Sequence, residues 1–285
     1  MTSAPARRVS GWDDIDYSVP LPDSFVLPET HWPSLHAAEL TPRQRIAANQ
    51  LAASFSCEMF IHCERYVISY MRDHRVRVRQ VVTDGALDRF IFEEELHIAA
   101  FYRLLNRLRP DTYPSPTSVL LKWSWLDRLV LKAAPAVSLF LIAALFEEMS
   151  LYVHEVMDEE PTQAYAPIRA VMAQHAVDEQ GHIKLDDHVL LKLTGFFPRW
   201  LYALQVWLSL PLMLYVDGVL GRAWRKLFAD FAAREQLPAS AAKALRARRP
   251  SRSDVIGIER FVAKLRGAPL PGSRLLCAAL SLATK

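Results

Sequence analysis

The chain has 285 residues, of which 51% are hydrophobic and 23% charged, and its formal net charge at pH 7 is +3. This much apolar material excludes a generally disordered chain, and the small, scattered charge argues against a nucleic-acid-binding protein. The length favours one large helical domain with appendages.

The first 40 residues are interrupted by five prolines, so we expect an extended segment that runs over the surface and could serve as a lid. Residues 41–285 are then expected to form a single helical domain. The N-terminus has no apolar stretch of the kind found in secretory signals, which favours a cytoplasmic protein. The cysteines agree with that location, because an odd number without a Cys-x-x-Cys pair disfavours a disulfide framework; they are Cys57, Cys63 and Cys277.

Apolar residues at helical spacing predict two long helices in the first part of this domain. The first begins at the Thr41-Pro42 start signal and runs to about residue 71. The second runs over 88–108, after a turn at 83–85, and is closed by Pro110 and the loop at 111–116.

Two further long helices are predicted after a shorter one over residues 120–131. One runs from Pro135 to about residue 156 and is stopped by Pro161, and the other runs from Pro167 to about Gly195. Strand-like alternation is absent from the sequence, so the fold class is all-α. The remaining segments are expected to be helices that pack around the bundle, over 200–231, 240–247, 254–265 and 274–282, with the basic stretch 246–252 as a solvated linker.

Residues 133–146 and 200–216 contain no charged side chain, so they require a test for membrane spans. Both are shorter than the ~20 apolar residues that cross a bilayer, and Pro211 interrupts the second. We therefore interpret them as buried helices of the bundle. The alternative is a helix at a membrane surface or along an apolar substrate tunnel, because Trp200 and Trp207 suit such an interface.

The chemistry is indicated by two copies of one motif, Glu94-x-x-His97 and Glu179-x-x-His182. Residues three apart project from nearly the same face of a helix, so each pair can bind one metal ion. Either copy alone is weak evidence, because surface glutamates are common on helices. Glu94 lies in an apolar stretch, however, where an unpaired carboxylate would be costly.

Single carboxylates on the alternate helices, Glu58 and Glu148, complete the order Glu, Glu-x-x-His, Glu, Glu-x-x-His. This order is found in ferritin-like four-helix bundles that hold two metal ions between their helices. Four carboxylates neutralise two divalent cations, and mixed oxygen and nitrogen ligands suit iron or manganese better than structural zinc. We favour two iron ions and leave manganese open.

Some choices within this set stay open. Glu58 and Glu64 lie six residues apart and face different directions, so only one can line the site; we prefer Glu58 and expect Glu64 to be solvated. Glu147 is the neighbour of Glu148 and could act in a supporting role. Asp178 is either a surface charge or a partner that orients a metal-bound imidazole. Isolated histidines are usually not ligands, so we do not assign His62 or His154.

His175 lies four residues before Glu179, which places a third imidazole on the same helical stripe. With His175-x-x-x-Glu179-x-x-His182, the chain resembles the p-aminobenzoate N-oxygenase family over about residues 45–193. Those enzymes use two iron ions and O2 to oxidise aryl amines. The resemblance implies that Glu94 and Glu179 bridge the ions. It also implies that the remaining ligands are Glu58 and His97 for one ion and Glu148, His175 and His182 for the other.

The resemblance implies an oxygenase that converts an amine to a hydroxylamine, nitroso or nitro product, with an external electron donor or reductase. The apolar segment after Pro198 motivates an alternative, in which the same centre hydroxylates or desaturates a lipophilic or carrier-bound acyl substrate. An iron-storage bundle is a third interpretation, disfavoured by the long appended segments. A homodimer is compatible with the sequence, although no motif encodes one.

Overall fold

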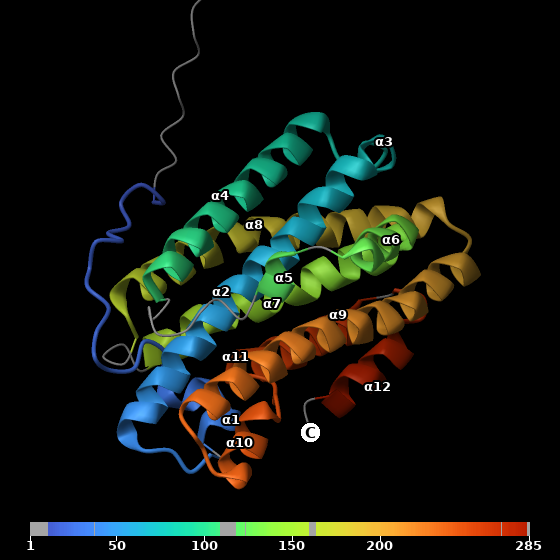
Figure 1. The fold of residues 1–285 in the computed structure, drawn as a ribbon. Helices are drawn as coiled ribbons and strands as arrows, with labels where there is room; N and C mark the ends of the chain where they lie inside the picture. Colours follow the sequence, from blue (N-terminus) through green and yellow to red (C-terminus); the bar gives the residue numbers. More distant parts are fainter. Residues whose placement is uncertain are drawn as a thin grey trace, which may run out of the picture.

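A computed structural model describes residues 11–36, 38–108, 118–122, 124–159, 164–268 and 270–283. Within these ranges every regular element is a helix, as Figure 1 shows, so the all-α class is confirmed. The predicted loop at 111–116 and the stop at Pro161 lie outside the described residues.

Four long helices form the ferritin-like core: α2 (Pro42–Asp73), α4 (Asp84–Leu108), α7 (Ala136–Glu159) and α8 (Ala166–Phe196). Helix α2 packs along α4, α7 packs along α8, and the two pairs meet where α4 contacts α8 and α2 contacts α7. The start of α2 is fixed by a capping box, in which Thr41 and Gln44 satisfy each other's backbone N–H groups. The four predicted long helices are therefore confirmed, and α4 begins four residues early because Thr83 caps its first turn.

The shorter helix predicted over residues 120–131 is two helices, α5 (Ser118–Leu121) and α6 (Trp125–Ala133). The break lies at Ser124, which caps α6 in a reciprocal capping box with Asp127. The Asp127 carboxylate also accepts hydrogen bonds from the hydroxyls of Tyr66, at 2.5 Å, and Tyr215, at 2.7 Å. Asp127 thus joins α6 to two neighbouring helices.

The C-terminal helices form an outer layer on the α2–α7 side of the bundle: α9 (Arg199–Arg234), α10 (Ala239–Arg246), α11 (Arg252–Gly267) and α12 (Ser273–Ala283). Helix α9 covers the helix predicted over 200–231 and continues through Pro211 without a break. Helix α11 lies very close to α7, because a Cβ at Gly257 would come within 2.5 Å of the Met149 Cα. In the basic linker, Arg248 is mostly buried and pairs with Asp217. The expectation that the linker is solvated is therefore wrong for this residue.

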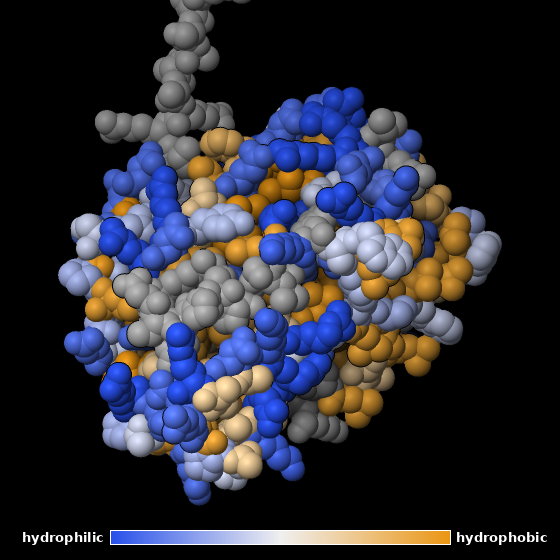
Figure 2. Space-filling model, in the orientation of Figure 1, coloured by the Kyte–Doolittle hydropathy of each residue, from blue (hydrophilic) through white to orange (hydrophobic). Residues whose placement is uncertain are grey.

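Helices α7 and α9 are long and apolar enough to cross a membrane by length and composition alone, although that test also selects core helices. The apolar window of α7 is 61% buried in the bundle, but that of α9 is only 39% buried. Helix α9 therefore departs from the expected buried helix. Its exposed side chains include Trp200, Leu204, Trp207 and Leu214. Figure 2 shows hydrophobic residues gathering on the side of the molecule that carries α9 and α12.

The segment from residue 11 to 40 runs along the bundle with two short helical turns, η1 (Glu29–His31) and α1 (Pro33–His36). Its backbone is held by side chains of the core, because Asn49 on α2 accepts hydrogen bonds from the N–H groups of Val26 and Leu27. Near its start, the Trp12 indole donates to Asp178 on α8 at 2.9 Å. The segment thereby covers one end of the interior side-chain cluster described below. One turn remains, α3 (Arg75–Val78), between α2 and α4.

Candidate metal centre

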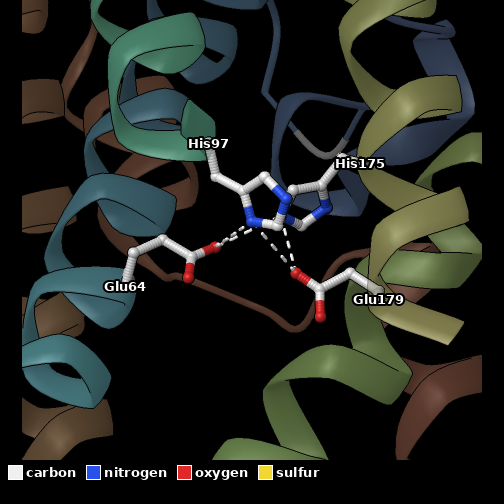
Figure 3. A group of neighbouring side chains, drawn as sticks. All are labelled: Glu64, His97, His175 and Glu179. Carbon is white, nitrogen blue, oxygen red and sulfur yellow. Dashed lines mark hydrogen bonds and ion pairs between the residues drawn. The ribbon is translucent and has the colours of Figure 1, made fainter. Parts of the chain in front are cut away.

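The bundle interior contains two overlapping groups of side chains whose ligand atoms lie within 4.8 Å of one another. One group joins α2, α4 and α8, and Figure 3 shows its side chains pointing toward one another. The second group joins α4 and α8. The first consists of Glu64, His97, His175 and Glu179, and the second of Glu94, His97, Glu179 and His182, and every one of these residues is buried.

The two Glu-x-x-His motifs face each other across the contact between α4 and α8. The Nδ1 atom of His97 lies 3.4 Å from Glu94 on its own helix and 3.6 Å from Glu179 on the opposite one. The Nδ1 atom of His182 lies 3.3 Å from Glu179 and 3.2 Å from Glu94. The spacing seen in the sequence therefore brings the ligand atoms of two carboxylates and two imidazoles within 4.8 Å of one another.

Each of these imidazoles is also oriented from outside by a carboxylate on the opposite helix. The Nε2 atom of His97 lies 3.3 Å from Asp178 on α8, and the Nε2 atom of His182 lies 3.2 Å from Glu93 on α4. This leaves both Nδ1 atoms directed inward, as expected when an outer carboxylate fixes a metal-binding imidazole. The open alternative for Asp178 is thus answered in favour of orientation. Glu93 was missed, although it precedes its Glu-x-x-His motif as Asp178 precedes the other.

On α2, the structure brings Glu64 to the cluster. Its carboxylate lies 3.2 Å from Nε2 of His175, which is itself 2.9 Å from Glu179. Only 7% of Glu64 is exposed, so the expectation that it is solvated is wrong. Glu58 is fully buried in α2 but belongs to neither group of ligand atoms. The six-residue separation turns the two side chains apart by about 120° at 100° per residue, and helix packing selects the face.

On α7, Glu147 faces the interior, whereas Glu148 points to the outer layer and forms an ion pair with Lys264 at 3.4 Å. Neither oxygen of Glu147 makes a hydrogen bond to a described residue. The same holds for Asp186 on α8, which is fully buried one helical turn beyond His182. The preference for Glu148 over Glu147 is not matched by this placement. Asp186 was missed, although it continues the stripe of residues 175, 179 and 182 at helical spacing.

Electrostatics divide the cluster into two kinds of carboxylate. Burial alone would raise the pKa of Glu94, but the neighbouring imidazoles of His182 and His97 outweigh it and lower the pKa below its ordinary value. Glu179 behaves in the same way, because its neighbouring imidazoles outweigh its burial. Burial likewise opposes protonation of His97, yet Asp178 and Glu94 raise its pKa to about 9.

The pKa values of Glu147 and Asp186, two buried carboxylates without a hydrogen bond to an imidazole, are shifted in the opposite direction. Burial, reinforced by repulsion from Asp186 and Glu179, raises the pKa of Glu147 well above its ordinary value. Burial also raises the pKa of Asp186, although the nearby His182 opposes it. The pKa of His175 is lowered, chiefly by its burial. Burial opposes protonation of His182, but Glu179, Glu93 and Glu94 outweigh it and raise its pKa well above the ordinary value. The raised pKa values of Glu147, Asp186, His97 and His182 favour their protonated forms, which limits the negative charge of the cluster.

The donor atoms at the centre of the cluster fit a pair of divalent cations. The buried atoms Oε2 of Glu94, Nδ1 of His97, Oε2 of Glu179 and Nδ1 of His182 make no hydrogen bond to a described residue, although they lie close together. A cation would satisfy them, and without one each is a costly buried polar atom. Carboxylate oxygens and imidazole nitrogens, with no thiolate in either group, are typical ligands of iron and manganese.

The isolated histidines lie outside these groups, as expected. The Nδ1 atom of His62 lies 2.7 Å from the Leu120 carbonyl oxygen, and His154 pairs with Asp158 within its own helix. The three cysteines are free.

A mainly apolar cavity of about 50 Å³ adjoins the cluster. Glu64, Glu147 and Glu179 line it together with aromatic and thioether side chains such as Phe146 and Met149. A cavity that holds a benzene ring measures about 150 Å³. An aromatic substrate can therefore enter only if some of these walls move, and flexible methionine side chains make such movement easy.

Comparison with known proteins gives one family. The family model described as P-aminobenzoate N-oxygenase AurF matches residues 1–265 of the chain. No curated protein and no solved structure matches.

Proposed function

Because the chain belongs to the p-aminobenzoate N-oxygenase family, we propose that it is a di-iron oxygenase that transfers one oxygen atom from O2 to the nitrogen of an aryl amine. The observation that supports this most directly is the buried cluster of three imidazoles and three carboxylates, whose central atoms lack hydrogen-bond partners among the described residues. Iron, rather than manganese, is the proposed metal, since the family uses it.

The placement of the side chains supports a modified ligand set. Glu94, His97, Glu179 and His182 would hold one ion, with Glu64 and His175 beside the other. Glu147 is the carboxylate that α7 offers to the interior. We therefore propose Glu64 and Glu147 in the roles that the family resemblance assigns to Glu58 and Glu148.

The first oxidation balances as R–NH2 + O2 + 2 e⁻ + 2 H⁺ → R–NHOH + H2O, so an external electron donor is required. The iron pair, when bound, supplies the redox chemistry that reduces O2. The protein's own contribution is positional: Asp178 and Glu93 fix the imidazoles, and the apolar cavity excludes water. A reducing cytoplasm is the proposed location, in keeping with the free cysteines.

The apolar lining of the cavity favours a second candidate, hydroxylation or desaturation of a lipophilic or carrier-bound acyl substrate. It uses the same centre and the same electron donor, so only the products separate the two. Both candidates differ from iron storage in stoichiometry, since an oxygenase of this kind holds two ions per chain.

The test is to load the protein with Fe(II) without oxygen, measure iron per chain, and add O2 and a reductant to a panel of aryl amines and fatty acids. Oxidised nitrogen products, identified by mass spectrometry with incorporation of ¹⁸O from ¹⁸O2, support the proposal. Glu155→Gln on the exposed side of α7 is the control and should retain activity. Two bound irons with oxidised acyl products and no oxidised amine would instead assign the second candidate.

A further inference from the structure

A second, much larger hollow lies in the outer layer. It is a groove of about 630 Å³ between α9 and helices α7, α11 and α12, which lie together along one side of the bundle (Figure 1). Its volume is within the range of small-molecule sites, about 300–1,000 Å³. None of the candidate metal ligands lines it.

The long walls of the groove are apolar. Leu145 on α7, Met213 and Leu214 on α9, Ile258 on α11 and Leu280 on α12 face it. Water in such a groove gains few hydrogen bonds, so an apolar chain that displaces it is stabilised by the hydrophobic effect.

Arginines converge on the groove from α9, α10 and the linker after α10. Arg225 and Arg246 are exposed, and no described carboxylate lies within ion-pair distance of either guanidinium. Arg248 pairs with Asp217, which also lines the groove. The other lining acid, Asp254, is buried and accepts a hydrogen bond from the Ser251 N–H. Two guanidinium groups therefore remain for an anionic ligand.

The groove also adjoins the cavity beside the carboxylate cluster. Four residues line both hollows and separate them: Met59, Phe146, Met149 and Asp254. The two methionines have unbranched side chains that change rotamer readily. These methionines are where the small cavity would open toward the groove.

We propose that the groove binds an amphiphile with an anionic head group, held by Arg225 and Arg246, and an apolar chain that lies along Leu214 and Leu280. The binding site is independent of any reaction at the cluster. Its further role as the entrance for an amphiphilic substrate rests on the proposed oxygenase function.

Calorimetric titration of the metal-free, full-length protein with dodecanoate and dodecanol below their aggregation limits tests the binding. Dodecanoate should bind one to one and at least 10-fold more tightly than dodecanol, because only the carboxylate pairs with the arginines. Dodecyltrimethylammonium should not bind. Dodecyl phosphate distinguishes the head groups: tighter binding than dodecanoate would assign a phosphate ligand. Equal affinity for the anionic, neutral and cationic chains, or no binding at all, would overturn the proposal.

The double variant Arg225→Ala/Arg246→Ala should weaken dodecanoate binding at least 10-fold and leave dodecanol binding within 2-fold. Its matched control is Lys226→Ala/Lys243→Ala, which removes the same charge from the same two helices outside the groove. If both double variants lost the same dodecanoate affinity, the effect would come from net charge alone, and this result would contradict the assigned site.

The place where the dodecanoate chain binds is tested separately, with a dodecanoate analogue that carries a photoreactive diazirine at its chain end. After irradiation, cross-links should map by mass spectrometry to peptides that contain Met213, Leu214 or Leu280. Cross-links confined to other surfaces would overturn the assignment. Since these measurements need neither iron nor O2, their failure is distinguishable from failure of the oxygenase proposal.

Discussion

Two sets of carboxylates share the interior of the bundle and differ in their partners. Glu94 lies beside two imidazoles and Glu179 beside three, and the pKa values of both carboxylates are lowered in spite of complete burial. Glu147 and Asp186 are equally buried but make no hydrogen bond to a described residue, and their pKa values are raised. We call these the imidazole-paired and the unpaired carboxylates.

Burial alone therefore does not set the charge of these carboxylates. A buried carboxylate stays ionised where an opposite charge and hydrogen bonds compensate its desolvation, and otherwise takes up a proton. The imidazole-paired carboxylates therefore favour the ionised form and the unpaired carboxylates the protonated form. Binding of cations should expel protons from the imidazoles and from the unpaired carboxylates, so metal affinity should rise with pH.

The largest effect is expected when an imidazole-paired carboxylate is removed. Glu179→Gln removes a carboxylate that lies beside His97, His175 and His182, so we expect at least one of two irons to be lost and activity to fall by more than ~10²-fold. Iron per chain and product formation are the measurements. Full iron occupancy with undiminished turnover would show that the imidazole-paired carboxylates do not form the centre.

A smaller effect is expected when the imidazoles lose their outer partners. Asp178→Asn and Glu93→Gln should each lower Fe(II) affinity by about 10–100-fold, as changes to such partners of metal-bound histidines do. Competition with a colorimetric chelator measures the affinity. Glu95→Gln on the exposed face of α4 is the control. Affinities indistinguishable from this control would remove the orienting role.

The unpaired carboxylates predict how the stability of the metal-free protein depends on pH. Unfolded carboxyl groups have a pKa of about 4, and the folded-state values of Glu147 and Asp186 lie above this. Their contribution to the free energy of unfolding is therefore fully present below about pH 4 and is lost as the pH rises through the folded-state values. Glu147→Gln/Asp186→Asn should stabilise the metal-free protein increasingly from pH 5 to pH 8 in urea unfolding.

That double variant is compared with the parent chain at each pH, because titratable groups far from the centre contribute equally in both. A difference between the two unfolding free energies that does not change with pH would contradict the raised pKa values.

The smallest effect is expected just outside the centre. Glu148→Gln removes only a partly exposed pair with Lys264, so the free energy of unfolding should change by about 0–1 kcal/mol. Iron per chain should stay at two, whereas Glu147→Gln should reduce it. The reverse order, with Glu148→Gln losing iron, would restore Glu148 as the α7 ligand.

Much of the architecture could be predicted because it is encoded locally. Prolines, caps and helical periodicity located the four core helices. One helix was predicted where the structure has two, because the capping box of Ser124 and Asp127, which starts α6, was overlooked. The motif spacings likewise placed Glu94, His97, Glu179 and His182 together, since residues three apart share a face in any α-helix.

The sequence alone therefore determined the helical bundle, its two Glu-x-x-His stripes and the family. Only the tertiary structure decided which way α2 and α7 are rotated about their axes, and so whether Glu58 or Glu64, and Glu147 or Glu148, turns inward. One residue changes direction by about 100° on a helix, and packing of the whole apolar surface against the neighbouring helices sets that angle. The groove beside α9 has the same origin, because its walls combine side chains of α2 and α7 with those of the C-terminal helices α9 to α12.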